Sequence, residues 1–349
     1  MTAPGRLWAL LGRRAGDNRQ IVALAEASGL AWEAKPLAFG DLTKRAATRN
    51  GSFRALDAPS RASLVPPWPD VVVAAGRWSA PIALAIRHAS GGRTRLVHVG
   101  RPWRPLSWFD LVVTTPQYGL PAAPNVLINA LPLTTPRAAA RDPALEALPR
   151  PRLLVLVGGD SPPRVLDAAA ARALGKAAIE RAARDQGSLL VATSPRTSPD
   201  AVAALTSVLA DATRPIRLSV FGEGTNHYAA FLTAADAIVV TDDSAAMTAD
   251  AVLSGAPVTL HRLPRRPTAA HRRMALARAL VDRVGVARAM FDRLIARGIV
   301  TSIRDLDRYA ERLEAEGLMA GGDRARRRAA AELEEAATRV RALVRPANP

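Results

Sequence analysis

The chain has no cysteine among its 349 residues. This excludes disulfides, thiolate zinc sites, iron–sulfur clusters and a cysteine nucleophile. The five histidines show no spacing typical of metal ligands, and the adjacent Asp242 and Asp243 lack the Asp-x-Asp spacing of a metal site. At least one of these two carboxylates is expected instead to interact favourably with the dipole at the N-terminus of the helix that follows. We therefore expect no metal and no bound cofactor.

Long apolar runs are also missing. The longest, such as residues 71–75 and 153–157, fall far short of the ~20 residues that cross a bilayer. The first eleven residues run into Gly12-Arg13-Arg14 without the apolar core and cleavage site of a signal peptide. We expect a cytoplasmic protein, either free or peripheral on the inner face of the cytoplasmic membrane.

Lysine is nearly absent, because 45 of the 48 basic residues are arginines, and the formal net charge is +17. The planar guanidinium suits phosphate, which keeps nucleic acid, anionic lipid and phosphorylated small molecules as candidate partners. GC-rich coding produces the same excess of arginine. Residues 261–300 hold ten arginines against Asp282 and Asp292, a local charge of +8. That segment fits either a solvated helix face or an anion-binding surface.

Apolar runs of strand length alternate with amphipathic stretches of helix length, which predicts parallel sheets with helices on both faces. In the first half we expect strands at 6–11, 31–37, 71–75, 95–99, 111–114 and 126–128, helices at 18–28 and 79–89, and a loop with a short helix over 38–63. In the second half we expect strands at 153–157, 189–193, 216–221, 237–241 and 258–260, with helices at 165–184, 199–210, 226–235 and 244–254. Two further helices are expected at 291–313 and 324–344. A Pro- and Arg-interrupted stretch at 133–151 separates two Rossmann-like α/β domains.

The segment 237–260 is the most informative part of the chain. It predicts a strand, a helix capped by Ser244, a Gly255 stop and a second strand. The free N–H groups at Ala245 to Met247 would face the carboxyl edge of the sheet, where a diphosphate binds well. Asp250 lies six residues beyond Ser244, ~9 Å along the helix axis at ~1.5 Å per residue, within reach of a ribose hydroxyl. An ordinary βαβ unit with a solvated Asp250 is the alternative.

Polar loops follow the other strands of the second half at the same edge. They are Gly158-Gly159-Asp160-Ser161, Thr193-Ser194-Pro195-Arg196-Thr197 and Gly222-Glu223-Gly224-Thr225-Asn226. None matches a P-loop or a dinucleotide fingerprint. Four polar loops that converge on one crevice are nevertheless what a nucleotide site needs.

The first half ends its strands in comparable loops. Gly12 to Gln20 contains Asp17 and Asn18, either of which can cap the following helix. Further loops are Gly76-Arg77-Trp78, Gly100-Arg101-Pro102 and Thr114 to Gly119. All six tryptophans precede residue 110, which fits either plain packing or an apolar cleft lining.

Several of these segments resemble the mitochondrial-fission Elm-type family. The segments that carry the resemblance are Gly16-Asp17-Asn18-x-Gln20, Gly76-Arg77, Arg101-Pro102, Phe109 to Tyr118 with its Thr-Thr-Pro-Gln-Tyr stretch, and Val240 to Met247 with its Asp-Ser-x-x-Met stretch. The resemblance covers most of the chain and implies a GT-B-like α/β fold, with two Rossmann-like domains facing a cleft and C-terminal crossover helices. The implied domains are 1–148 on the acceptor side, 149–275 on the nucleotide-sugar donor side, and helices in 276–349, the last of which packs back on the N-terminal domain. The family pattern has Glu where this chain has Asp250.

The leading hypothesis is a metal-independent GT-B glycosyltransferase that uses a nucleotide sugar, on a membrane- or envelope-linked acceptor. The predicted donor-binding residues are Gly158, Gly159, Ser194, Arg196, Gly222, Asn226, Asp243, Ser244, Ala245, Met247 and Asp250. The predicted acceptor or cleft residues are Gly16, Asn18, Gln20, Gly76, Arg77, Arg101 and Gln117. Asp17 is the candidate catalytic base, and Arg196 and Arg77 are candidates to stabilise the leaving diphosphate.

Three alternatives stay open at the level of sequence. The same scaffold could epimerise a nucleotide sugar, or the chain could be a non-catalytic adaptor on an anionic membrane surface. Nucleic-acid binding ranks last, because no recognition motif accompanies the basic residues. The sugar, the nucleotide, the acceptor and the oligomeric state are left open.

Overall fold

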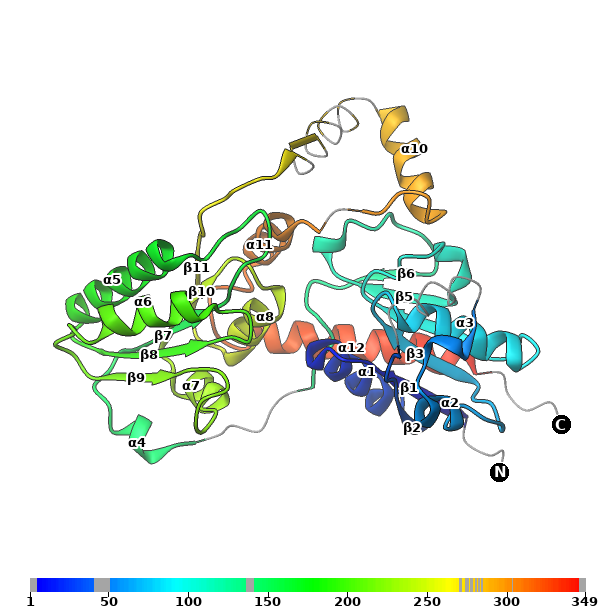
Figure 1. Ribbon diagram of the computed structural model, residues 1–349, viewed down its shortest axis with the longest axis horizontal. Coiled ribbons are helices and arrows are strands. Elements are labelled where there is room, and N and C mark those ends of the chain that lie inside the picture. The colour runs from blue at the N-terminus through cyan, green and yellow to red at the C-terminus, as the bar shows by residue number, and fades with distance from the viewer. Residues whose placement is uncertain are drawn as a thin grey trace. The chain divides into compact units, whose positions relative to one another are not determined.

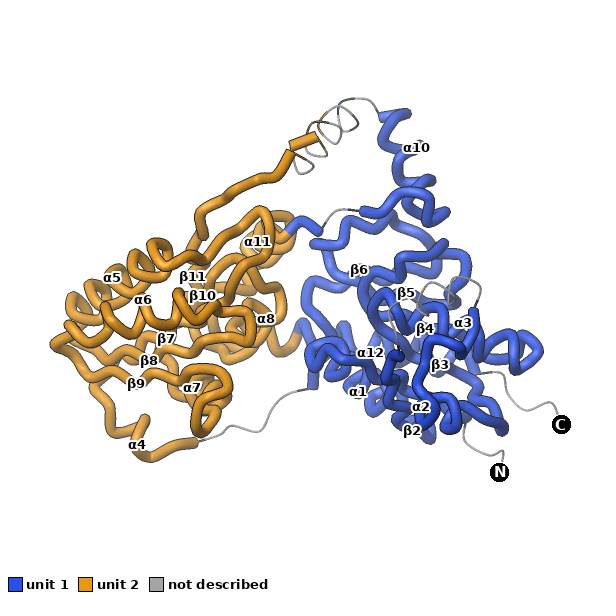
Figure 2. Tube along the Cα trace, viewed as in Figure 1, with its two compact units in different colours: residues 1–135, 281–305, 328–349 blue, residues 136–280, 306–327 orange. Residues whose placement is uncertain are grey.

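The chain forms two compact units in the computed structural model (Figure 2). Unit 1 holds residues 1–135, 281–305 and 328–349, and unit 2 holds residues 136–280 and 306–327. The structure describes residues 5–40, 51–135, 141–269, 272–273, 276, 279, 281, 283, 285–302 and 304–344. Residues 41–50 of the expected loop and part of the basic 261–300 segment lie outside these ranges. Neither unit is a continuous stretch of sequence, and the boundary after Thr135 precedes the predicted domain limit at residue 148.

Unit 1 is built on a six-stranded parallel sheet with the order β2-β1-β3-β4-β5-β6 (Figure 1). The strands are β1 Arg6–Leu11, β2 Ala31–Pro36, β3 Val71–Ala75, β4 Arg95–Val99, β5 Leu111–Thr114 and β6 Val126–Ile128. The helices are α1 Ala15–Ala27, α2 Ala58–Ala62, α3 Ser79–Ala89, α10 Gly285–Ala296 and, from residue 328 onward, α12 Arg324–Leu343, with short 3₁₀ turns η2 Phe53–Ala55, η3 Leu106–Trp108 and η4 Pro116–Tyr118.

The core of unit 1 lies on both faces of this sheet. Strand β3 reads Val-Val-Val-Ala-Ala and is buried throughout, as expected of a parallel strand covered on both sides. Successive side chains point to opposite faces. Val71 and Val73 pack with α1 and α12, whereas Val72 and Ala74 pack with α3 and α10.

Unit 2 is built on a five-stranded parallel sheet with the order β11-β10-β7-β8-β9. The strands are β7 Arg152–Val157, β8 Ser188–Thr193, β9 Ile216–Ser219, β10 Ala237–Thr241 and β11 Val258–His261. The helices are α4 Pro143–Glu146, α5 Ala168–Arg184, α6 Pro199–Leu209, α7 Tyr228–Ala234, α8 Ala245–Ser254 and α11 Leu306–Ala315. Strands β7 and β8 pack their apolar side chains against α5 and α6.

Side-chain caps fix where α5, α6 and α8 of unit 2 begin. The Asp167 Oδ1 atom accepts from the Ala170 N–H at 2.9 Å, and the Ser198 Oγ atom accepts from the Ala201 N–H at 3.2 Å. Ser244 caps α8 as predicted, with Oγ accepting from the Met247 N–H at 3.4 Å. These bonds satisfy N–H groups that have no partner inside the helix.

Each sheet reverses its strand order once, at a point where a crevice forms beyond the carboxyl ends of the strands. In unit 1 the reversal lies between β1 and β3, and in unit 2 between β7 and β10. The loops that the sequence singles out follow these strands. Both candidate sites are therefore at topological switch points.

Two predictions about helices were wrong. The helix expected over 291–313 is two helices, because Gly298, at φ +67°, ends the first one. The Gly298 and Ile299 N–H groups donate to carbonyls of the last turn of α10, at 2.9 and 3.0 Å, which closes that turn. Helix α1 begins at Ala15 rather than at residue 18, so neither Asp17 nor Asn18 is its cap.

Within the described parts of the chain, no helix is both long enough and apolar enough to cross a membrane.

Candidate functional site

The carboxylate of Asp243 lies at the switch point of unit 2 and is fully buried. Its Oδ2 atom accepts from the Gly159 N–H at 3.1 Å and from Arg196 Nη2 at 2.6 Å. Its Oδ1 atom accepts from Thr241 Oγ1 at 2.6 Å. Asp243 therefore ties together the loops after β7, β8 and β10, and its position holds Arg196 at the sheet edge.

The glycine pair after β7 lets these loops approach one another. A Cβ atom on Gly158 would lie 2.0 Å from Asp243 Oδ1, and one on Gly159 would lie 2.0 Å from the carbonyl oxygen of Arg196. The sequence predicts a close backbone approach here, and the close neighbours are residues of the chain itself. Glycine is required at both positions for this reason.

Arg196 extends from a tight turn after β8. The Ser194 Oγ atom accepts from the Arg196 N–H at 3.2 Å, and the Ser194 N–H donates to Thr197 Oγ1 at 3.0 Å. The Arg196 side chain is 40% exposed even though one of its nitrogens is bound to Asp243. Since a guanidinium has five N–H donors, Arg196 can bind an anion while it keeps this ion pair.

Helix α8 begins directly after this cluster. Ala245 and Met247 are buried, whereas Ala246 is exposed and Asp250, one turn further along, is half-buried. The backbone N–H groups of Ala245 and Ala246 belong to the first turn, which lacks intrahelical partners. Helix α8 thus presents N–H donors at its start and a carboxylate on the same side as the exposed Ala246, one turn further along.

Asp250 has a neighbour that the sequence did not reveal. The Tyr228 hydroxyl at the start of α7 donates to Asp250 Oδ2 at 3.1 Å. Asn226 positions that helix, because its Oδ1 atom accepts from the Tyr228 N–H at 3.0 Å. Gly222, at φ +87°, turns the chain after β9 and before this contact.

An ion-pair cluster, in which only Arg164 and Asp242 are buried, lies beside the start of α8. Asp242 pairs with Arg164 Nε at 2.8 Å, and Arg164 Nη2 pairs with Asp307 at 2.7 Å. Arg262 and Arg265 also reach Asp307, at 3.2 and 2.5 Å. Three guanidinium groups against two carboxylates leave one positive charge in excess at this edge. No spacing in the sequence could have joined residues so far apart along the chain.

The switch point of unit 1 places Asp17 against Gly76. Gly76 has φ +82°, and a Cβ atom there would lie 3.6 Å from Asp17 Oδ2. Burial raises the pKa of Asp17, while the charges of Arg14 and Arg304 act in the opposite direction. A carboxylate with a raised pKa takes up a proton more readily than an ordinary aspartate does.

Asn18, Gly16 and Gln20 lie along the same helix. The Asn18 amide forms two 2.8 Å bonds with the backbone of Gly12, so it fixes the β1–α1 loop instead of capping the helix. Gly16 lies in the first turn, where a Cβ atom would have no neighbour within 4 Å, and Gln20 is half-buried further along. Gln117 is buried in η4, where its backbone carbonyl accepts from the Asp305 N–H at 2.7 Å.

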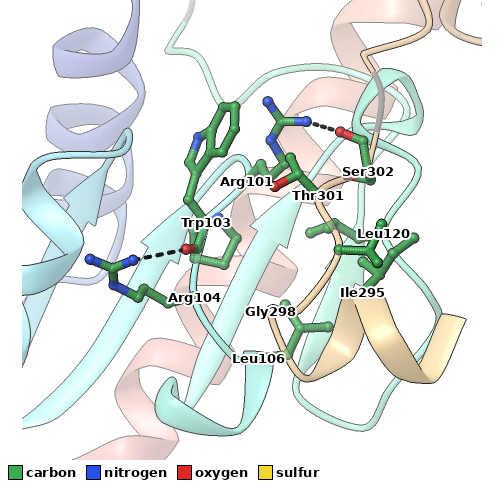
Figure 3. A pocket seen from close by; sticks show the side chains of 11 residues that line it. Arg101, Trp103, Arg104, Leu106, Leu120, Ile295, Gly298, Thr301 and Ser302 are labelled. Carbon is green, nitrogen blue, oxygen red and sulfur yellow. Dashed lines mark hydrogen bonds between the residues drawn. The ribbon is translucent and has the colours of Figure 1, made fainter. Parts of the chain in front are cut away.

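Trp103, which the sequence did not single out, joins the two predicted loop arginines of unit 1. The guanidinium carbon of Arg101 lies 3.5 Å from the Trp103 ring centroid, and that of Arg77 lies 5.7 Å from it. Figure 3 shows Trp103 and Arg101 together at a pocket lined also by Arg104, Leu106, Ile295 and Ser302. Arg101 donates to the Ser302 carbonyl, which anchors the guanidinium at this position.

Known proteins share features of this sequence and architecture. The sequence matches the family described as Mitochondrial fission ELM1 over residues 15–316. The chain belongs to this family. No curated protein matches the ELM1-family chain by sequence.

Solved structures share the fold of this ELM1-family protein at low identity. The glycotransferase of kitacinnamycin is 14% identical, covers 99% of this chain and 100% of its own, and has a TM-score of 0.52. MurG from Acinetobacter baumannii is 15% identical over 98% of this chain and 99% of its own, with a TM-score of 0.40. A putative UDP-N-acetylglucosamine 2-epimerase from Listeria monocytogenes is 14% identical over 90% of this chain and 95% of its own, with a TM-score of 0.49. The two parallel sheets, together with the TM-score of 0.52 to the glycotransferase, show that the ELM1-family protein has a GT-B fold with two Rossmann-like units, as predicted.

Proposed function

We propose that this protein is a metal-independent GT-B glycosyltransferase with a nucleotide sugar as donor. The observation that carries the proposal is the β7/β10 switch point of unit 2. There the start of α8, the exposed guanidinium of Arg196 and the carboxylate of Asp250 lie at one sheet edge. The GT-B fold supports the same reading, although fold alone does not assign an activity.

In this proposal unit 2 binds the donor through its diphosphate and ribose. The N–H groups of Ala245 and Ala246 and the Arg196 side chain bind the diphosphate. A ribose hydroxyl donates to Asp250, which lies ~6 Å along the helix from Ala246 at ~1.5 Å per residue. The Tyr228 hydroxyl donates to Oδ2 of the same carboxylate, and a carboxylate has two oxygens that can each accept hydrogen bonds.

Unit 1 binds the acceptor in this proposal, and Asp17 is the base. The acceptor hydroxyl oxygen forms a bond to the anomeric carbon while its proton passes to Asp17. The bond between the anomeric carbon and the diphosphate oxygen breaks, and the diphosphate leaves with the electron pair. A base whose pKa burial has raised is closer to the operating pH than an ordinary aspartate.

The charge that a metal supplies in other transferases comes here from the chain. Arg196 and the first turn of α8 face the leaving diphosphate, and the pairing of Arg164, Arg262 and Arg265 with Asp242 and Asp307 adds one net positive charge nearby. Donors fixed in place before the reaction stabilise developing charge without reorganisation.

The test is a calorimetric screen of the full chain against UDP-, GDP- and CMP-linked sugars. We expect one nucleotide to bind saturably and Asp250→Ala to weaken it about tenfold, the loss of one charge-assisted hydrogen bond. Arg184→Gln is the matched control. Arg184 is the last residue of α5, near the amino ends of the strands and away from the switch point at their carboxyl ends. The absence of binding by every nucleotide sugar, or equal affinities of the Asp250→Ala and Arg184→Gln variants, contradicts the proposal. Turnover of the donor with no acceptor present would identify an epimerase instead.

A further inference from the structure

Four arginines gather around the switch point of unit 1, and we call Arg14, Arg77, Arg101 and Arg304 the basic cluster. Arg14 follows β1, Arg77 follows β3 and Arg101 follows β4, so three of them lie at the carboxyl ends of adjacent strands. Arg304 completes the set: the N–H of the next residue, Asp305, donates to the Gln117 carbonyl after β5 at 2.7 Å, and the charge of Arg304 acts on Asp17 and Arg101. With the carboxylate of Asp17 set against the four guanidinium groups, these five residues carry a net charge of about +3.

Trp103 lies beneath two of these guanidinium groups. Arg101 and Arg77 both lie over its ring, at 3.5 and 5.7 Å from the centroid, and Arg77 also lies 5.0 Å from the Trp78 ring. Trp103 has φ +58°, a left-handed conformation that is unfavourable for a bulky side chain. Strained backbone of this kind persists where the surrounding structure imposes it, often at ligand sites.

Like charges act on one another within the basic cluster. The pKa of Arg101 is lowered to about 10, mainly by burial, with Tyr118 opposing the shift and the charge of Arg304 contributing to it. Arg14, Arg77 and Arg304 are exposed, so a ligand can reach them. An anion with two negative charges would relieve this repulsion, and the planar guanidinium fork matches phosphate oxygens.

We propose that the basic cluster binds a phosphate monoester group carried by the acceptor. Its role as an acceptor site rests on the proposed glycosyltransferase function, whereas the binding itself does not. The phosphate oxygens accept from the Arg77 and Arg101 guanidinium edges beside Trp103. Asp17 lies on the neighbouring loop, where it can take the proton of an acceptor hydroxyl. The same group occurs on soluble sugar phosphates and on phosphatidic acid.

The six tryptophans provide the readout, because all of them lie in unit 1. Glycerol 3-phosphate is titrated into the full chain while intrinsic fluorescence is followed. We expect a saturable change, and we expect Arg77→Gln and Arg14→Gln each to weaken binding about tenfold or more. Arg93→Gln is the control, since Arg93 is exposed before β4 at the opposite edge of the same sheet. No saturable binding, or equal weakening by Arg93→Gln, overturns the proposal.

Further experiments distinguish a lipid from a soluble source of the phosphate. They also test the phosphate site separately from the glycosyltransferase function. Sedimentation with phosphatidic acid vesicles, lost in Arg77→Gln but not in Arg93→Gln, identifies a lipid source, whereas glycerol 3-phosphate binding alone identifies a soluble one. Displacement of glycerol 3-phosphate by a free nucleotide would assign the cluster to the donor and overturn the acceptor assignment. If the chain binds glycerol 3-phosphate but no nucleotide sugar, the phosphate site is supported and the glycosyltransferase function is contradicted.

Discussion

Gly158→Ala should destabilise unit 2 by displacing one buried carboxylate. The new Cβ atom would lie 2.0 and 2.2 Å from the two oxygens of Asp243, distances that no real contact reaches. Because Gly158 has no positive φ, the contact alone decides the effect. The carboxylate must leave the position in which Gly159, Thr241 and Arg196 donate to it.

The expected loss follows from that geometry. Breaking a buried ion pair costs about 3–5 kcal/mol. Arg196 is 40% exposed and its charge stays partly solvated, so the lower end, about 3 kcal/mol, applies. With a urea m-value of about 2 kcal/mol/M, the unfolding midpoint should fall by about 1.5 M.

Far-UV circular dichroism in urea measures this shift, and Gly16→Ala is the matched control. Gly16 has no atom within 4 Å of its Cβ position and lies in α1, where alanine is favoured by up to about 1 kcal/mol. Its midpoint should stay unchanged or rise slightly. A Gly158→Ala midpoint equal to that of Gly16→Ala would refute the packing described for Asp243.

Three further predictions concern unit 1. Burial lowers the pKa of His98 to about 3, and the unfolded chain protonates near 6.5. Neutral His98 therefore does not destabilise the fold above pH 6.5. As the pH falls from 6.5 towards 3, the free energy of unfolding decreases, by about 2–3 kcal/mol at pH 4.5. Urea midpoints should show this decrease in the wild type but not in His98→Leu. Glu332 accepts from the Ala130 and Leu131 N–H groups at 2.7 and 3.1 Å, so Glu332→Ala should cost about 2–4 kcal/mol by tryptophan fluorescence and Glu332→Gln less. Asp17→Asn should slow sugar transfer at least about 100-fold in a product assay while calorimetry finds donor affinity unchanged; an unchanged rate would remove Asp17 as the base.

Much of the fold is predictable because strand period and helix caps are local properties. Every expected strand appears within three residues of its predicted ends, and Ser244 and Gly255 delimit α8 as their capping chemistry requires. The break between α10 and α11 was missed because a lone glycine in a helical pattern signals only weakly that the chain turns there. The predicted domain limits stay a prediction.

The candidate site was less accessible from the sequence, since its contacts join distant segments. The polar loops were found, but the pairing of Arg196 with Asp243 and of Tyr228 with Asp250 depends on strand order. Arg77 and Arg101 were identified without the tryptophan that lies beneath them. Of the arginine excess, the structure gives definite partners to Arg164, Arg196, Arg262 and Arg265 at the edge of unit 2.

Hydrogen exchange of the full chain with and without a bound nucleotide sugar tests whether the donor binds at the β7/β10 switch point. The donor should protect backbone amides in residues 242–250 and 194–197, because the α8 N–H groups and the Arg196 loop contact it. Protection confined to unit 1, or none in unit 2 at saturating donor, would contradict the assignment of the β7/β10 switch point as the donor site.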